Sequence, residues 1–432
     1  MAVTPSSFLL RKRPLEAAVR NSMDPTRPTR VAEAILQQYN SLQVKDDGWT
    51  VVAGIAAVDA AGRVHVLAAA SGCKCVGKLE KCDDVVRDGH AEVVARRAFR
   101  RALCDDPDTY QIARSSECWL FATAPPCGDA AIYELDDSTI AFSGAKLGDW
   151  RREDAQVTGA VRLKPGRSDV PVDRRSGSLS CSDKILKWSV CGLPGALLRA
   201  RFPDDIPLKG VVVAAQPRAA TLEQALDRAL FQRAEYLAAA CHQRPPLLRT
   251  RVTDVGADFA ARRGVGKPSS LIVAWWRGCG APEILIAATG RPRGATKSSK
   301  AVPRLATASF LEKLGVRDRA AHVAKAPRRA LDVAVREVLR ADLAKRSTHP
   351  QLPPAAGPGP SAAACPSDPS PPCPTALRLR QRRPPPPPMV LTASCASPLY
   401  SPPTLSSTTT HLPSCCPRTC NMATCAYDRL AA

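Results

Sequence analysis

Apolar residues along this chain form short continuous runs in some places and recur at every third or fourth position in others. Continuous apolar runs bounded by turn residues are typical of buried strands. They predict strands at residues 49–58, 64–69, 118–123, 210–214, 271–276 and 283–287. Gly62 lies between the first two strands, and Gly278 and Gly280 lie between the last two, so both pairs are expected to form hairpins.

Segments with helical spacing alternate with these strands. Val31, Ile35 and Tyr39 are spaced as on one face of a short amphipathic helix, and Val94 and Ala98 belong to a second such face. The same spacing predicts helices over about 31–43, 90–103, 181–198, 221–240, 308–314 and 330–345. Strands that alternate with helices are typical of the α/β class, and this fold class is therefore predicted.

Composition divides the chain into three parts. Half of its 40 prolines lie in the last 83 residues, among many Ser, Thr and Ala. Such a segment cannot bury enough apolar area to offset its ordering entropy, so residues 346–432 are predicted to be a disordered Pro/Ser/Thr-rich tail. Residues 1–30 are predicted to be a flexible arm, and residues 31–345 a folded domain.

The net charge of +21 over 432 residues indicates a polyanionic partner, most simply nucleic acid, with an ordinary basic surface as the alternative. The N-terminus lacks the apolar core of a secretory signal, which favours reduced cysteines in an intracellular compartment, the cytoplasm or the nucleus. Organelle targeting by residues 1–23 is the less favoured alternative. No apolar run is long enough for a membrane span, and no membrane association is expected.

A histidine and a glutamate one residue apart, His90 and Glu92, stand at the start of the predicted helix 90–103. Zinc deaminases of bases use three protein ligands, a water in the fourth position and a glutamate outside the ligand set that moves protons. Their usual trace is H-x-E followed by P-C-x-x-C. Pro126 and Cys127 supply part of the second half, but Ala130 stands where its second cysteine would be.

Cys181 is the best candidate for the third ligand, because it lies 54 residues after Cys127 at another predicted helix start. At a helix N-terminus the dipole favours the thiolate that metal binding requires, and His90, Cys127 and Cys181 are all expected in that position. Each motif alone is weak, since most buried cysteines are small apolar residues. Their order and their helix-start contexts favour the metal site.

Three blocks, Asp88–Arg97, Pro126–Ala130 and Leu179–Trp188 with the Gly192–Leu198 segment, closely resemble the signature of the adenosine-to-inosine RNA deaminase domain. The resemblance covers about residues 31–315. It implies a cytidine-deaminase-like three-layer α/β/α fold, with a mixed central sheet, helices on both faces and a C-terminal extension. It also implies zinc ligation by His90, Cys127 and Cys181, and proton transfer by Glu92.

The family further implies an inositol hexakisphosphate buried in the core. The matching positions are Asp88, Arg96, Arg97, Lys164, Lys184, Lys187, Trp188 and Arg291. Asp88 and Lys184 would link this cofactor to the zinc site. The physical alternative for Arg96 and Arg97 is a solvated helix face with a Glu92–Arg96 pair. Lys187 replaces an arginine of the family, Pro194 replaces a glutamine, and the family's C-terminal section is not recognisable after about residue 320.

Within the family, the Lys164–Arg167 turn and the Ala295–Lys297 loop look like the tRNA-specific enzymes of eukaryotes. The segment before the domain also lacks the double-stranded-RNA-binding pattern of the editors. The tRNA resemblance implies deamination of the adenosine immediately 3′ of the anticodon, position 37, of alanine tRNA. Alternatives are an editor of structured or double-stranded RNA and a non-catalytic zinc-containing RNA-binding protein. A monomer is expected, with RNA phosphate contacts from Arg151, Arg152, Arg291, Arg293, Lys297 and Lys300.

Overall fold

The computed structural model describes residues 24–46, 48–77, 83–141, 144–147, 156–164, 176–216, 218–244, 246, 248–254, 266–296, 299, 301–326 and 329–347. Apart from Arg346 and Ser347, which belong to a helix, the predicted tail lies outside these residues, as does most of the predicted N-terminal arm. The first helix, α2 (Arg27–Ser41), begins four residues before the predicted start, with Pro28 in its first turn. Proline suits that position because the first N–H groups of a helix have no intrahelical partner.

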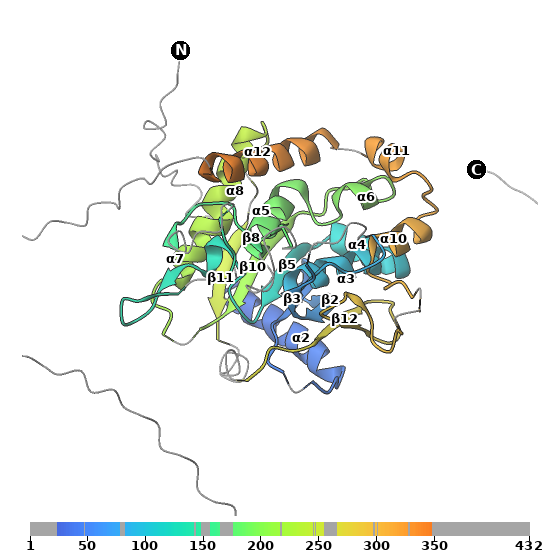
Figure 1. Ribbon diagram of the computed structural model, residues 1–432, viewed down its shortest axis with the longest axis horizontal. Coiled ribbons are helices and arrows are strands. Elements are labelled where there is room, and N and C mark those ends of the chain that lie inside the picture. Colours follow the sequence, from blue (N-terminus) through green and yellow to red (C-terminus); the bar gives the residue numbers. More distant parts are fainter. Residues whose placement is uncertain are drawn as a thin grey trace, which may run out of the picture. The chain divides into compact units, whose positions relative to one another are not determined.

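An eight-stranded mixed sheet forms the centre of the molecule (Figure 1). Strand β10 runs parallel to β5 and β11, whereas the other neighbouring pairs are antiparallel. The two predicted hairpins are confirmed as β1–β2 and β12–β13. In spatial order the strands are β11 (Arg249–Thr253), β10 (Leu208–Ala214), β5 (Glu117–Ala122), β1 (Val52–Val58), β2 (Val64–Ser71), β12 (Leu271–Trp276), β13 (Glu283–Ile286) and β14 (Arg291–Pro292).

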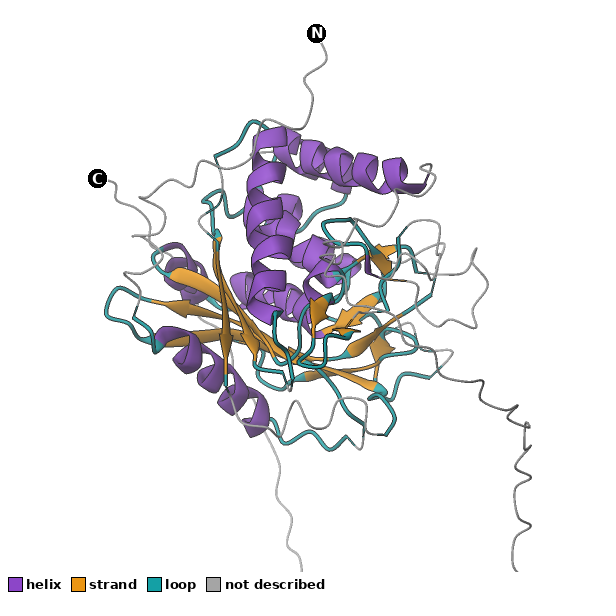
Figure 2. Ribbon diagram, turned by 90° about the vertical axis from the view of Figure 1, so that its left-hand side faces the viewer, coloured by secondary structure: helices purple, strands orange, loops and turns teal. Residues whose placement is uncertain are grey.

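Helices cover both faces of this sheet, as Figure 2 shows, and the predicted three-layer α/β/α architecture is confirmed. Helix α2 packs Val31 and Ile35 against Trp119 and Phe121 on one face. The further helices are α3 (Ala91–Asp105), α4 (Pro107–Arg114), α5 (Cys181–Cys191), α6 (Gly195–Arg199), α7 (Leu222–Leu226), α8 (Arg233–Ala240), α10 (Thr307–Lys313), α11 (Arg319–Ala324) and α12 (Arg329–Ser347). A π-helical segment, Asp227–Gln232, joins α7 to α8.

Alanines from both sides contribute to the interface between α3 and the sheet, beside larger residues such as Val94, Phe99 and Ile55. Ala95 and Ala98 of α3 are fully buried in the same cluster as Ala53 of β1 and Ala68 of β2. Side chains this small let the helix lie close to the strands, and close packing without voids is the normal state of a protein interior. The first turn of α3, which carries Glu92, is thereby placed against the centre of the sheet.

A further layer extends the fold at its C-terminal end. Helix α12 packs Leu331 and Val335 against Leu186 of α5 and Leu237 of α8, in a buried cluster of its own (Figure 1). The predicted C-terminal extension is therefore present.

The predicted helix from Cys181 toward Leu198 ends early, at Cys191. Gly192 has φ +81°, a conformation that ends an α-helix and favours glycine, and α6 starts three residues later. Several short elements lack a clear apolar pattern and were not predicted. They are α4, α11, β11, β14, β3 (Cys73–Cys75), β4 (Asp88–His90), β6 (Tyr133–Glu134), β7 (Ile140–Ala141), β8 (Leu163–Lys164) and β9 (Ser178–Leu179).

We expect Gly210→Ala to destabilise the sheet. A β-carbon at Gly210 would lie 2.0 Å from the Trp119 ring, which is itself fully buried. Overpacking of a core commonly costs about 1–3 kcal/mol of the free energy of unfolding. Chemical denaturation would measure this loss, and Gly144→Ala is the control because a β-carbon there meets no atom within 4 Å. Equal stability of the two variants would contradict the prediction.

Candidate active site

Three side chains from separate elements converge beside the first turn of α3. His90 ends β4 and precedes α3, Cys127 lies in the loop after β5, and Cys181 is the first residue of α5. Their candidate ligand atoms all lie within 4.8 Å of one another. His90 Nδ1 is 3.8 Å from Cys127 Sγ and 3.6 Å from Cys181 Sγ.

Backbone contacts fix the two cysteine segments against each other. The Ser182 N–H donates to the Cys127 carbonyl at 3.0 Å, and the Cys181 N–H donates to Cys127 Sγ at 3.3 Å. Gly128 makes this approach possible, because a β-carbon there would lie 2.2 Å from the Ser180 hydroxyl and its φ is +108°. The Ser180 hydroxyl caps α5 by accepting from the Asp183 N–H, as the sequence predicts.

One expected context is wrong. Cys181 lies at a capped helix N-terminus, but Cys127 is followed only by the three-residue 3₁₀ turn Asp129–Ala131. The chain leaves this turn toward β6, so Cys127 starts no helix of its own, although the Cys181 N–H at the start of α5 donates to its sulfur. Instead, hydrogen bonding with Cys181, together with the charges of Lys164 and His90, holds the pKa of the Cys127 thiol well below its usual range.

The donor set fits a zinc ion. Two cysteine sulfurs and one imidazole nitrogen are ligands that Zn²⁺ prefers, and three protein ligands leave a fourth position open, as in catalytic zinc sites. Glu92, two residues after His90, is only 3% exposed. Burial, reinforced by the nearby charge of Cys127, raises the pKa of its carboxyl group, and a raised pKa suits a group that takes up and releases protons during catalysis.

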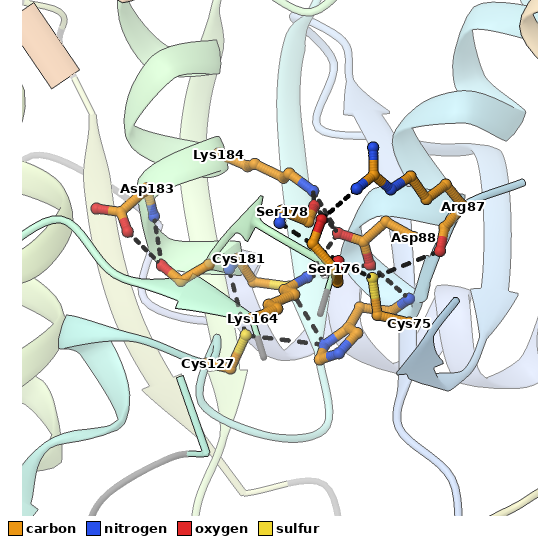
Figure 3. A network of polar contacts seen from close by, with 12 residues as sticks. Cys75, Arg87, Asp88, Cys127, Lys164, Ser176, Ser178, Cys181, Asp183 and Lys184 are labelled. Atoms are coloured by element: carbon orange, nitrogen blue, oxygen red, sulfur yellow. Dashed lines mark hydrogen bonds and ion pairs between the residues drawn. The ribbon is translucent and has the colours of Figure 1, made fainter. Parts of the chain in front are cut away.

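A buried ionic network adjoins this donor set (Figure 3). Lys164 Nζ donates to Asp88 Oδ2 at 2.8 Å and to Cys181 Sγ at 3.0 Å. Lys184 also pairs with Asp88, and the Ser178 hydroxyl donates to the same carboxylate at 3.1 Å. Asp88 Oδ1 in turn accepts from the His90 N–H at 3.1 Å. Asp88 thereby connects both lysines to the backbone of the histidine.

We expect Asp88→Asn to destabilise the protein by about 3–5 kcal/mol, the usual cost of removing one partner from a buried ion pair. Asp88 is 5% exposed, and its loss leaves Lys164 and Lys184 without their common carboxylate. Thermal and denaturant unfolding would measure the effect. Asp204→Asn, which breaks the exposed Arg114 pair, serves as control and should cost less than about 1 kcal/mol. A similar loss of stability in both variants would show that Asp88 is not the common ion-pair partner of the two lysines.

A basic cavity of about 590 Å³ opens beside this network, between α3, α5 and α12. Of the residues assigned to inositol hexakisphosphate, Asp88, Arg96, Arg97, Lys184, Lys187 and Trp188 line it. The sequence analysis missed Arg100, Arg336 and Arg340. Arg100 lies one helical turn after Arg96, a spacing that could have revealed it, but the two α12 arginines depend on tertiary packing alone.

Two of the predicted cavity residues lie elsewhere. Lys164 Nζ donates to Asp88 and to Cys181 Sγ, and the residue does not line the cavity. Arg291 lies on β14, where its guanidinium donates to Asp84 at 2.6 Å. The sequence could not show this, because Asp84 precedes Arg291 by 207 residues.

Arg96 and Arg97 do not form a solvated helix face. The Arg96 guanidinium lies 4.9 Å from the centre of the Trp188 ring, and Arg97 donates to the Leu305 carbonyl at 2.9 Å. Burial lowers the pKa of Arg96 to about 10. Arg96 Nε and Arg100 Nε are buried and have no hydrogen-bond partner among the described residues, so the cavity fits an anionic ligand.

Of the residues expected to contact RNA, Arg293 is exposed in the turn after β14, beside Arg291. Arg151, Arg152, Lys297 and Lys300 lie outside the described residues. Among the helices that the structure describes, none is both long and apolar enough to cross a bilayer.

Comparisons with known proteins agree with this site. Residues 103–332, which hold Cys127 and Cys181, match the family description "Adenosine-deaminase (editase) domain". The tRNA-specific adenosine deaminase 1 of Drosophila melanogaster is 33% identical over 246 residues, 49% of this chain and 60% of that protein. The same enzyme from Saccharomyces cerevisiae is 24% identical over 232 residues, 42% of this chain and 57% of its own.

Editors of double-stranded RNA also match. The double-stranded RNA-specific editase B2 of Rattus norvegicus is 28% identical over 268 residues, 53% of this chain and 34% of that protein. The chain thus spans less than two thirds of each of these relatives. The family match covers more than half of the chain, and the fold and the donor set agree with it. The chain belongs to the adenosine-deaminase (editase) domain family, whose members act on RNA.

Proposed function

We propose that this protein catalyses the zinc-dependent hydrolytic deamination of adenosine to inosine in tRNA. The observation that carries the proposal is the convergence of His90, Cys127 and Cys181 beside the buried carboxyl group of Glu92. A structural metal site has no use for a buried acid next to its ligands. A hydrolytic site needs one, because a proton must be moved from water to the leaving amine.

The chemistry divides between the metal and the chain. Zinc, when bound, lowers the pKa of a water molecule toward neutrality. His90, Cys127 and Cys181 would hold that ion, and the Glu92 carboxylate would take a proton from the attacking water. The resulting carboxylic acid then delivers the proton to the amino group that leaves C6 of adenine. Lys164, 3.0 Å from Cys181 Sγ, compensates the negative charge of the thiolates.

The substrate proposal rests on the relatives. Two of them carry the name tRNA-specific adenosine deaminase 1. We propose the adenosine immediately 3′ of the anticodon, position 37 of alanine tRNA, as the target. A base in a loop leaves its stack more easily than one in a duplex. An editor of structured RNA is the alternative, favoured by the match to the editase of rat.

We further propose that the basic cavity binds inositol hexakisphosphate. The unpartnered Nε atoms of Arg96 and Arg100 and the arginines of α12 support this assignment. Mass spectrometry of the small molecules released on denaturation would test it. A protein that releases no polyphosphate, and whose melting temperature does not respond to added inositol hexakisphosphate, would refute it.

Sequencing of inosine in total tRNA after incubation with the purified protein tests the main proposal. We expect inosine at position 37 of alanine tRNA and none in a perfectly paired RNA duplex supplied at equal concentration. Inosine in the duplex alone would establish the structured-RNA alternative. Full zinc occupancy without inosine in either RNA would establish a non-catalytic RNA-binding protein.

A further inference from the structure

Two fully buried aspartates follow the two cysteines at the same interval. Asp129 lies two residues after Cys127, Asp183 lies two residues after Cys181, and both are 0% exposed. A single arginine, Arg233, lies between them. Its Nη2 donates to Asp183 Oδ1 at 2.6 Å, and its Nη1 faces Asp129 Oδ2 at 3.7 Å. Among the described residues, neither Arg233 Nη1 nor Asp129 Oδ2 has a hydrogen-bond partner.

Each aspartate is also tied to its own surroundings. Asp183 Oδ2 accepts from the Ser180 hydroxyl at 2.5 Å and from the Arg162 N–H at 2.9 Å, which fixes the start of α5. Asp129 Oδ1 accepts from the Gly159 N–H at 2.8 Å. Each carboxylate thus belongs to its own cysteine segment, and the Arg233 guanidinium joins the two in addition to the backbone contacts of Cys181 and Ser182 with Cys127.

The π-helical segment explains how Arg233 reaches this position. Arg228 and Arg233 are five residues apart, which in a regular α-helix would place them on different faces. Hydrogen bonding from residue i to i+5 widens the turn and brings such residues closer to one face. Both arginines accordingly reach Asp129, Arg228 at 3.4 Å and Arg233 at 3.7 Å.

We propose that Arg233 is a positioning residue that holds the Cys127 and Cys181 segments at the separation required for metal binding. This inference rests on the proposed metal centre. Without Arg233, the buried carboxylate of Asp183 would lose its ion-pair partner and that of Asp129 would keep only Arg228, so the charge that balances the two carboxylates beside the cysteines would be reduced and their bridge lost. The planar fork of an arginine can bind two carboxylates at once, which a lysine cannot reproduce.

Zinc release to a chromogenic chelator tests this role without relying on deamination. We expect Arg233→Gln to release zinc about 10–100-fold faster than the wild-type protein, the usual effect of losing a partner that orients metal ligands. In the cobalt-substituted protein, the thiolate-to-cobalt absorption bands should shift as well. Arg233→Lys should fall between the two in zinc release, and it covers the case in which Arg233→Gln does not fold.

Arg199→Gln is the matched control, because Arg199 is 2% exposed and pairs with Asp205, but it contacts neither aspartate that follows a cysteine. It should lower thermal stability and leave zinc release and the cobalt bands as in the wild type. Folded Arg233 variants that match the wild type in both measurements would overturn the positioning role. Wild-type protein that holds no zinc would overturn the metal centre itself, so the two failures are distinguishable.

Discussion

Glu92→Gln should strongly slow inosine formation while leaving zinc content and the fold unchanged. Glutamine has nearly the same shape as glutamate, but its amide cannot take up and deliver a proton. General acid–base catalysis contributes about 10²–10⁴-fold to a rate, and we expect a loss of this size. The Glu92 side chain does not belong to the converging donor set, so the metal should remain. Single-turnover inosine formation and elemental analysis of zinc would measure both effects.

Glu283→Gln is the matched control for this experiment. Glu283 is also buried, at 8% exposure, but it lies on β13, where it accepts from the backbone N–H groups of Arg304 and Leu305 and does not belong to the donor set. It should retain the wild-type rate per folded molecule. A Glu92→Gln protein that forms inosine at the rate of this control would show that another group moves the proton.

Cys181→Ala should remove both zinc and activity. Cys181 is fully buried and contributes one of the three converging donor atoms. Two remaining ligands hold zinc poorly. Loss of a residue that only hydrogen-bonds to a ligand lowers metal affinity about 10–100-fold, and loss of the ligand itself should lower it further. Dialysis against a competing chelator followed by zinc analysis would measure it.

Cys191→Ala offers a close comparison, since Cys191 lies on the same helix at 2% exposure but at its far end. That variant should keep its zinc. Equal zinc retention by Cys181→Ala and Cys191→Ala would exclude Cys181 as a ligand. Loss of zinc from both would point to a general disturbance of α5 instead of a missing ligand.

Local signals explain which elements the sequence could predict. The apolar runs of β1, β2 and β12 and the Ser180 cap are set by neighbouring residues, and the structure has them where expected. β11, with the sequence Arg-Thr-Arg-Val-Thr, carries no such signal. It becomes a strand because the edge of β10 offers unpaired backbone groups.

The residues of the candidate site also fall into two groups, those that local motifs predict and those that only tertiary packing places. Short motifs located His90, Glu92, Cys127 and Cys181, and the structure brings the histidine and the cysteines together. Arg336 and Arg340 reach the basic cavity only because α12 packs across α5, a contact between distant parts of the chain. The contact of Arg233 with Asp183 could not be predicted either, because it depends on a π-helical turn and no periodic sequence pattern indicates such a turn.

The alanine interface under α3 bears on how this site can move. The buried alanines of α3, β1 and β2 have no side-chain rotamers, so this part of the layer beneath α3 has fewer alternative packings to exchange into on the picosecond-to-nanosecond timescale. Amide hydrogen exchange should accordingly be slowest in the middle of α3 and in β1, where opening requires the whole layer to separate. We therefore expect the first turn of α3 to keep its position when an RNA base enters the site.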